Sequence, residues 1–445
     1  MICGPTLDTR DLPVSCSQPA ALNLYEKALT QFQSYIGDPI ATIEEALREA
    51  PDFTLGHIFK AVALMTMSEQ RFLAGAHASV DAARRLLPAS NARERLLMAA
   101  TDKMVKGDWD AACAGFDNVL VDYPRDAFAI QSAHLMDFFR GDSRNLRSRI
   151  TRVLPHWTAD VPGYSYVLGM YAFGLEECNQ YTEAEETGRR ALALEPKDAW
   201  AIHAVTHVME MQGRTEEGIR WLESRKNDWA VNNNFAFHNW WHLALFYLDR
   251  GRCANALAVY DYQIHSVPPD FVLQLLDATA LLWRLHLEHV ELGDRASTVA
   301  DNWADRFETE RGFYAFNDLH AMMAFVMAGR QGEADQLIAD MEWTVTNGSG
   351  INVMMTRDVG LPLCRAIRAF GQERYSTVVS LIEPVRDIAN RFGGSHAQRD
   401  VLTLTLIEAA IRSGQHRRAQ HYIAERTVTR PGGQWGARLL QRASL

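Results

Sequence analysis

The stretch that decides the fold is YPRDAFAIQSAHLMDFFRG, residues 123–141, which overlays EPKDAWAIHAVTHVMEMQG, residues 195–213, at an offset of 72 residues. Each copy contains a proline, an acid that begins a helical run (Asp126 or Asp198), and a glycine that ends the run. Proline is disfavoured inside a helix, and glycine readily adopts the left-handed conformation that ends one. An offset of 72 is two periods of about 36 residues, the length of one helix pair with its turns. The match therefore predicts stacked helix pairs.

The join between a glycine and a second helix recurs further along the chain. In three joins an alanine lies five residues past the glycine, at a point where two helices must approach closely. The joins are GRCANALAVY (251–260, with Ala256), GRQGEADQLI (329–338, with Ala334) and SGQHRRAQHYI (413–423, with Ala419). This spacing resembles the tetratricopeptide repeat, whose period is about 34 residues. Because the alternation typical of strands is rare in the sequence, we expect essentially no sheet.

The composition limits the class of protein. Of the 445 residues 47% are hydrophobic and 22% are charged, the net charge is −10, and Lys and Arg form no basic run. We therefore expect neither nucleic acid nor a membrane as a partner, and we predict a soluble cytoplasmic protein. The cysteines form no CxxC pair, which argues against disulfides and cysteine zinc sites. They are Cys3, Cys16, Cys113, Cys178, Cys253 and Cys364.

These patterns predict an all-α fold, a tetratricopeptide-like α-α superhelix. In such a solenoid antiparallel helix pairs stack on their neighbours, and the array is either open or curved into a closed ring around a central cavity. Because a repeat array grows by stacking, we expect one continuous helical-repeat domain over residues 21–426. An N-terminal extension, 1–20, precedes it and a C-terminal tail, 427–445, follows. Aromatic residues at packing positions, such as Trp200 and Tyr247, belong to the core.

Six further strings are richer in His, Asn, Asp and Arg than a helical repeat requires. They are HWTADVPGYSYVLGMYAFGL (156–175), DAWAIHAVTHVMEM (198–211), FHNWWHLALF (237–246), FNDLHAMMAF (316–325), RDVGLPLC (357–364) and GGSHAQRDV (393–401). Together they resemble the tetratricopeptide repeat protein 38 family, in the order of that family, with weaker similarity back to about residue 20. The resemblance implies a helical-repeat protein without an established biochemical activity. One departure is Met209, where the family string has a third histidine.

Histidines and acids form a band on the predicted concave face. Residues four apart share one face of a helix, so His203 and His207 form one pair, which Glu210 continues, and His238 and His242 form another. With Gly213 at the fifteenth repeat position, the first three residues fall at the fifth, ninth and twelfth positions. In the proteins that this chain resembles, these positions line the groove. His238 falls at a groove position, whereas His242 falls at a position that is partly buried.

Two kinds of chemistry fit this band. The imidazoles and the carboxylate of His203, His207, Glu210 and His238 can bind a divalent metal such as zinc, with an open position for water. The spacing differs from the HExxH metalloprotease pattern and permits a metal without requiring one. Alternatively, the same groups act without metal as proton donors and acceptors, because imidazole titrates near neutral pH. Asp318 is a further candidate catalytic residue.

A second set of residues is expected to bind substrate. The repeated pattern Asn-x-x-His gives Asn239 with His242 and Asn317 with His320. It also fits a purely structural pairing, since buried polar atoms need partners. A repeated Arg-Asp-Val unit places Arg357 and Arg399 at expected helix starts, where the aspartates cap free amides. These arginines either bind a carboxylate or phosphate, or link neighbouring repeats in ion pairs.

The sequence therefore favours a concave pocket that binds a small polar or anionic molecule and transforms it through histidine, with or without metal. The alternative is a non-catalytic scaffold that holds a peptide or partner protein in its groove. Motifs of other chemistries are absent, including the Walker loop and the GxSxG elbow. Reaction type, substrate and metal identity are open at this stage.

Overall fold

The structure is a computed structural model that describes residues 6–16, 18–267 and 269–444, so Cys3 lies outside the described residues. Helices account for 76% of the chain, which confirms the all-α prediction. The sheet in the described residues consists of two short antiparallel strands, β1 (Thr6–Leu7) and β2 (Pro13–Val14). The five described cysteines are free thiols.

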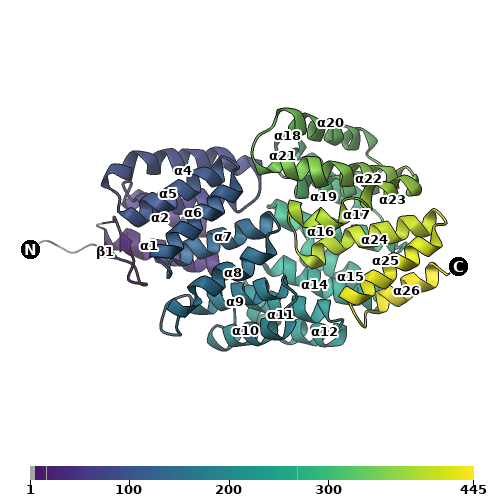
Figure 1. Cartoon of the computed structure of the whole chain (residues 1–445), viewed down its shortest axis with the longest axis horizontal. Coiled ribbons are helices and arrows are strands. Elements are labelled where there is room, and N and C mark those ends of the chain that lie inside the picture. Colours follow the sequence, from purple (N-terminus) through teal and green to yellow (C-terminus); the bar gives the residue numbers. More distant parts are fainter. Residues whose placement is uncertain (1–5, 17, 268, 445) are drawn as a thin grey trace, which may run out of the picture. The chain divides into compact units, whose positions relative to one another are not determined.

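The first compact unit spans residues 1–205 and 228–235. Consecutive helices pack as pairs, including α1 with α2, α3 with α4, α5 with α6 and α9 with α10 (Figure 1). The elements are α1 (Pro19–Ser34), α2 (Pro39–Glu49), α3 (Thr54–Met65), η1 (Gln70–Phe72), α4 (Leu73–Leu86), η2 (Leu87–Ala89), α5 (Ala92–Val105), α6 (Trp109–Asp122), α7 (Ala127–Phe139), α8 (Ser143–Val153), η3 (Leu154–His156), α9 (Tyr164–Glu176) and α10 (Tyr181–Leu194). Helices α11 (Ala199–Met211) and α13 (Lys226–Trp229) cross the boundary between the two units.

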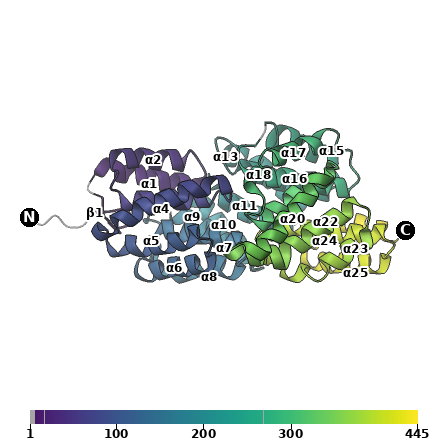
Figure 2. The same cartoon turned by 90° about the horizontal axis from the view of Figure 1, so that it is seen from above.

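The second compact unit spans residues 206–227 and 236–445. Its helices also follow one another as packed pairs, such as α22 with α23 and α24 with α25 (Figure 2). The elements are α12 (Thr215–Ser224), α14 (Ala236–Asp249), α15 (Cys253–Val259), η4 (Tyr260–Ile264), α16 (Val272–Leu287), α17 (Arg295–Ala304), α18 (Phe307–Glu310), α19 (Ala315–Met327), α20 (Gln331–Asn347), α21 (Ile351–Met355), η5 (Thr356–Gly360), α22 (Leu361–Gly371), α23 (Tyr375–Ile382), η6 (Arg386–Phe392), α24 (His396–Arg412), α25 (His416–Thr429) and α26 (Gln434–Arg442). Helix α16 packs against α14, α19 and α24 and forms the centre of this unit.

The two matched stretches form helices that begin after the predicted aspartate and end just before the predicted glycine. Asp126 caps α7 by accepting a hydrogen bond from the backbone N–H of Ala129 at 2.9 Å, and Asp198 caps α11 in the same way. The glycines that end these helices have positive φ, +65° at Gly141 and +67° at Gly213. Such backbone favours glycine because a side chain is strained there.

The small residues at the repeat joins also lie where the sequence predicts. Ala256, Ala334 and Ala419 are buried, as close helix packing requires. Gly213 has a second constraint, since a Cβ atom at this position would lie 1.8 Å from the carbonyl oxygen of Pro431. The chain after α25 therefore passes directly against the end of α11.

Three features differ from the sequence-based expectations. Asp358 lies in η5, a π-turn in the middle of a helical run, and it pairs with Arg357 instead of capping a helix. Ser395 caps α24 in place of Asp400, which lies one turn further on. The expected C-terminal tail contains helix α26, and the expected N-terminal extension contains the β1–β2 pair. The boundaries 21–426 and the curvature of the array stay predictions.

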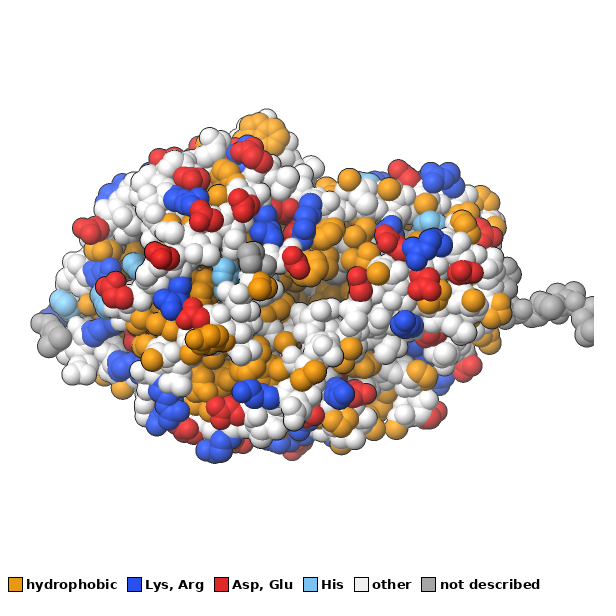
Figure 3. All heavy atoms as spheres, turned by 180° about the vertical axis from the view of Figure 1, so that it is seen from behind, with side chains coloured by type: hydrophobic (Ala, Val, Ile, Leu, Met, Phe, Trp, Pro, Cys, Tyr) orange, Lys and Arg blue, Asp and Glu red, His pale blue; other side chains and the backbone are white. Residues whose placement is uncertain are grey.

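Charged side chains of both signs are mixed on the face shown in Figure 3, and hydrophobic side chains lie between them. This agrees with a sequence in which Lys and Arg are scattered. Among the described helices, none combines the length and the apolar character needed to cross a membrane.

Candidate metal centre

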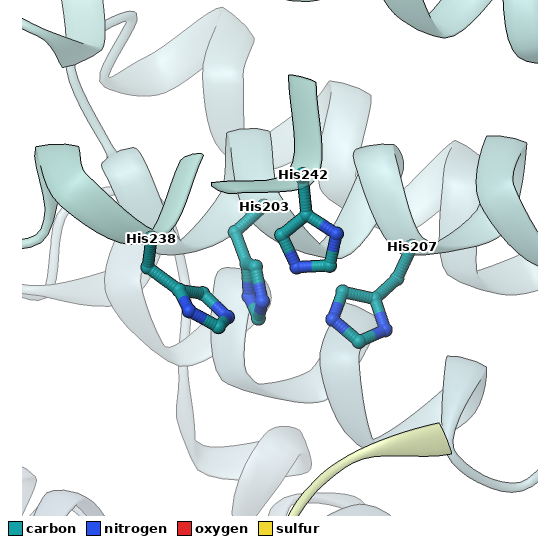
Figure 4. Close-up of side chains that lie close together, drawn as sticks. All are labelled: His203, His207, His238 and His242. Carbon is teal, nitrogen blue, oxygen red and sulfur yellow. The ribbon is translucent and has the colours of Figure 1, made fainter. Parts of the chain in front are cut away.

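Four histidines from α11 and α14 lie together in the interior. His203 and His207 are one turn apart on α11, and His238 and His242 are one turn apart on α14 (Figure 4). Each histidine has one ring nitrogen that lies within 4.8 Å of a ring nitrogen on each of the other three. All four side chains are buried, and His238 is the most accessible at 6% exposure. The two i, i+4 pairs predicted from the sequence therefore form one cluster, which we call the histidine cluster.

Each histidine of α14 contacts a buried carboxylate. The Nδ1 of His238 lies 2.7 Å from Oδ2 of Asp277 on α16, and the Nδ1 of His242 lies 2.8 Å from Oε2 of Glu210 on α11. Asp277 is 2% exposed and Glu210 is 8% exposed. Because a carboxylate accepts hydrogen bonds, Nδ1 carries a hydrogen in both imidazoles, and in the neutral tautomer that this fixes the lone pair is on Nε2.

Aromatic rings fix the orientation of the α14 histidines. Trp241 stacks on His238 with an interplanar angle of 13°, and it meets His242 edge-on at 4.9 Å between centroids. His207 and His242 also meet edge-on, at 4.5 Å between centroids. These contacts hold the imidazoles close to one another in an environment from which water is largely excluded.

The environment of His242 favours its neutral form. Burial lowers the pKa of this imidazole well below its ordinary value, and the neighbouring His207 and His238 lower it further. A neutral imidazole can donate a lone pair to a metal ion, whereas an imidazolium cannot. His242 is therefore in the protonation state that metal binding requires at neutral pH.

Glu210 connects the cluster to a chain of ion pairs in the second unit. Its Oε1 accepts a hydrogen bond from Arg430 at 2.6 Å, and Arg430 also lies 3.8 Å from Asp400. Asp400 accepts two hydrogen bonds from Arg426, at 2.9 and 2.8 Å. Burial raises the pKa of Asp400, but Arg426 and Arg430 outweigh it, so the net pKa is lowered. Both oxygens of Glu210 thus have fixed partners.

Three expectations about the site change. The sequence places the histidines on the concave face, where they line a groove, but in the structure they are buried, because Trp241 and the neighbouring helices cover them. Glu210 was expected among the metal ligands, whereas in the structure its carboxylate accepts a hydrogen bond from Nδ1 of His242. His242, expected to bind substrate, lies inside the cluster. Asn239, another substrate-binding candidate, is fully buried on the same helix, α14.

The remaining candidates lie outside the histidine cluster. Asp318 is buried on α19, where it accepts a hydrogen bond from the N–H of Gly312, and burial raises its pKa to about 7. The Nδ1 of His320, also on α19, donates to the carbonyl oxygen of Phe316 at 2.8 Å. Arg357 is exposed, and Arg399 donates to the carbonyl oxygen of Gly394.

The structure adds two residues that sequence reasoning missed. Asp277 was detectable, since it is the single charged residue between Val272 and Trp283 in an otherwise apolar helix. A lone acid in such a helix needs a buried partner. Arg430 gave no such signal, because its partner Glu210 lies 220 residues earlier in the chain.

Comparison with solved structures agrees with this fold class. No family model matches the chain. A tetratricopeptide repeat protein from Parabacteroides merdae is 16% identical, with 63% of this chain and 99% of that chain covered and a TM-score of 0.36. Human IFIT1, a dimer with m7Gppp-AAAA, is 12% identical, with 94% and 98% covered and a TM-score of 0.43. PPR10 in complex with an 18-nt psaJ RNA element is 12% identical, with 89% and 64% covered and a TM-score of 0.29. The chain is a helical-repeat protein of the tetratricopeptide type.

One expectation about partners is corrected by these matches. The scattered charges led us to exclude nucleic acid, but IFIT1 and PPR10 are helical-repeat proteins seen with RNA. The lack of a basic run therefore does not exclude nucleic acid as a partner for a protein of this fold. The likeness itself extends to the fold alone.

Proposed function

We propose that this chain is a metal-binding helical-repeat protein of the tetratricopeptide repeat protein 38 family. Its histidine cluster binds one divalent transition metal, with Zn²⁺ as the best match. The observation that carries the proposal is the pair of carboxylates, Asp277 and Glu210, on the Nδ1 atoms of His238 and His242. Metal-ligating histidines almost always donate their second ring N–H to such a partner, which fixes the tautomer and raises ligand basicity.

The ligand geometry needs only small adjustments to accept a metal. In a tetrahedral site with metal–nitrogen bonds of about 2.0–2.1 Å, the nitrogens lie about 3.4 Å apart. The cluster nitrogens lie within 4.8 Å of one another. Rotations of the imidazole rings about their side-chain bonds supply the remaining contraction. Imidazole nitrogen suits zinc, copper, nickel and iron, whereas calcium and magnesium prefer oxygen, so the donor set favours a transition metal.

The charges near the cluster also support a dication. Asp277 and Glu210 are both buried, and a buried carboxylate is costly unless it is paired. Glu210 is paired with Arg430. The ionisable group of the described residues that Asp277 contacts is His238, so a bound divalent ion would supply the positive charge that a neutral His238 does not. If three histidines bind and the fourth position admits water, the metal can act as a Lewis acid.

The direct test is metal analysis of untagged protein. We expect about one zinc per chain after equilibration with Zn²⁺ in competition with a chromogenic chelator, and loss of this zinc in His207→Ala and His242→Ala. His320→Ala is the matched control, because His320 is equally buried in the same unit but lies outside the cluster. Circular dichroism verifies that each variant stays helical. Wild-type protein that takes up no Zn²⁺, Cu²⁺, Ni²⁺ or Co²⁺ would end the proposal.

A further inference from the structure

A small polar cavity lies next to Glu210 within the second compact unit. Its volume is about 30 Å³, enough for about two water molecules. Its walls include three arginines, three acids and two aromatic rings. These residues are Glu210, Asp249, Phe246, Arg284, Asp400, Arg426, Arg430 and Trp435. Since a cavity with charged walls is hydrated or occupied by a polar group, the state of each charge decides what fits.

Arg284 is the unusual charge in this wall. Its side chain is 1% exposed, and its N–H groups donate to the carbonyl oxygens of Ala280, Ala397 and Gln398 at 3.0, 2.8 and 3.2 Å. No carboxylate of the described residues lies within 4.0 Å of it. A guanidinium has five N–H donors, so two are left for a further acceptor. Burial lowers the pKa of Arg284 to about 10.

The other two arginines of the wall have carboxylate partners. Arg426 makes two hydrogen bonds to Asp400, and Arg430 binds Glu210 at 2.6 Å. Their charges are therefore compensated within the protein. Asp400 and Glu210 act on Arg284 electrostatically without an ion-pair contact. The group that contacts its guanidinium directly is the face of Trp241, whose ring centroid lies 5.1 Å from the guanidinium carbon. A cation–π contact offsets part of the cost of burying a cation, but less than an ion pair does.

Other buried arginines of this protein are paired with carboxylates. The largest fully buried side chains include Arg93, Arg149 and Arg284. Arg93 lies 2.7 Å from Asp126, and Arg149 lies 2.8 Å from Asp117 and also pairs with Asp137. Among these three, Arg284 alone has no carboxylate within 4.0 Å in the described residues, and it alone lines the cavity. The arginine without a direct ion-pair partner therefore lies where there is space for an anion.

We propose that this cavity binds a small monovalent oxyanion of the carboxylate class, such as formate or hydrogen carbonate, with Arg284 as its main anchor. A planar oxyanion matches the fork of the guanidinium, and three or four heavy atoms suit a space of two waters. Sulfate, phosphate and larger carboxylates are too bulky. Because Arg284 and the cavity carry the inference, it holds with or without metal in the histidine cluster.

The experiment uses the full-length, metal-free protein at constant ionic strength. Formate or hydrogen carbonate, titrated against chloride, should raise the thermal midpoint with the logarithm of concentration, as a ligand of the folded state does. Isothermal titration of formate should give one saturable site. Arg284→Met should abolish both effects. Arg442→Met is the control, since it removes one positive charge in the same unit outside the cavity wall and should leave both effects intact.

Two results would overturn the site. One is the absence of saturable formate or hydrogen carbonate binding to the wild type. The other is equal stabilisation by sulfate, which would contradict the size of the cavity. If Arg284→Met fails to fold, Arg284→Lys gives the same information, because it keeps the charge but lacks the fork and should weaken formate binding at least tenfold. Unchanged affinity in that variant would remove Arg284 from the site.

Discussion

Helices α7 and α11 share the same sequence pattern, but their histidines have different surroundings. His134 of α7 is 1% exposed and lies between Phe173 and Trp200, at centroid distances of 6.0 and 5.7 Å. Within the described residues neither of its ring nitrogens has a hydrogen-bond partner. His207 of α11, one position after the residue equivalent to His134, lies beside three other imidazoles. Burial alone thus makes a histidine part of the core, whereas neighbouring donors and carboxylates make it a candidate ligand.

Metal binding should differ most between leucine substitutions at His242, in the cluster, and at His134, in the core. His242→Leu should abolish metal binding, because it removes one ligand and leaves Glu210 facing an apolar side chain. His134→Leu should leave metal binding intact and raise the free energy of unfolding by about 1–2 kcal/mol, since a buried polar group without partners is costly. Zinc competition titrations and urea unfolding of both variants measure this contrast. Loss of zinc in both would mean that the surroundings do not distinguish them.

The carboxylates behind the cluster should have an intermediate effect. Asp277→Asn keeps the size of the side chain and can still accept a hydrogen bond, but it removes the negative charge. We expect a 10–100-fold loss of metal affinity, equal to about 1.4–2.7 kcal/mol, with little change in helical content. Arg430→Ala should act in the same direction through Glu210. Affinities equal to the wild type in both variants would show that the carboxylates do not support ligands.

The sequence predicted the helices better than the site, for physical reasons. Asp198 begins α11 and Gly213 ends it through interactions with residues a few positions away. The bounds of this helix could therefore be predicted from the local sequence. The i, i+4 rows likewise placed His203 with His207. The role of Glu210 could not be predicted, because its partners His242 and Arg430 lie 32 and 220 residues later in the chain. Burial of the cluster also depends on packing between helices, which a repeat register does not fix.

The pH dependence of stability gives a separate test for the buried histidines outside the cluster. Burial lowers the pKa of His134 to about 3 and that of His320 to about 4. The unfolded chain therefore binds more protons between pH 6.5 and these values, and metal-free protein should lose about 1.4 kcal/mol per pH unit for each such histidine as the pH falls. In His134→Leu the loss of stability per pH unit should be smaller by about 1.4 kcal/mol, because one titrating histidine has been removed. Identical slopes in urea unfolding at pH 6 and 5 would contradict the lowered pKa.

The smallest effect concerns Asp318, the catalytic candidate that lies outside the cluster. Its pKa is raised to about 7 by burial, so the folded state binds a proton that the unfolded state releases between pH 3.8 and 7. Stability is therefore lost as the pH rises through this window. Asp318→Asn removes this titration, so it should be more stabilising at pH 7 than at pH 6 by about 1 kcal/mol. Destabilisation at both pH values would show that the charged carboxylate is needed.

The contact between Gly213 and Pro431 restricts how this sequence can diverge. Glycines that end helices are commonly replaced by asparagine, which tolerates positive φ. A Cβ atom added at Gly329 or Gly414 would meet no other atom of the described residues within 4 Å, whereas at Gly213 the carbonyl oxygen of Pro431 occupies that space. Related chains that keep the segment after α25 should therefore keep glycine at this position, while those that have lost the segment are free to change it. An alignment of many relatives would show residue 213 and the C-terminal segment varying together.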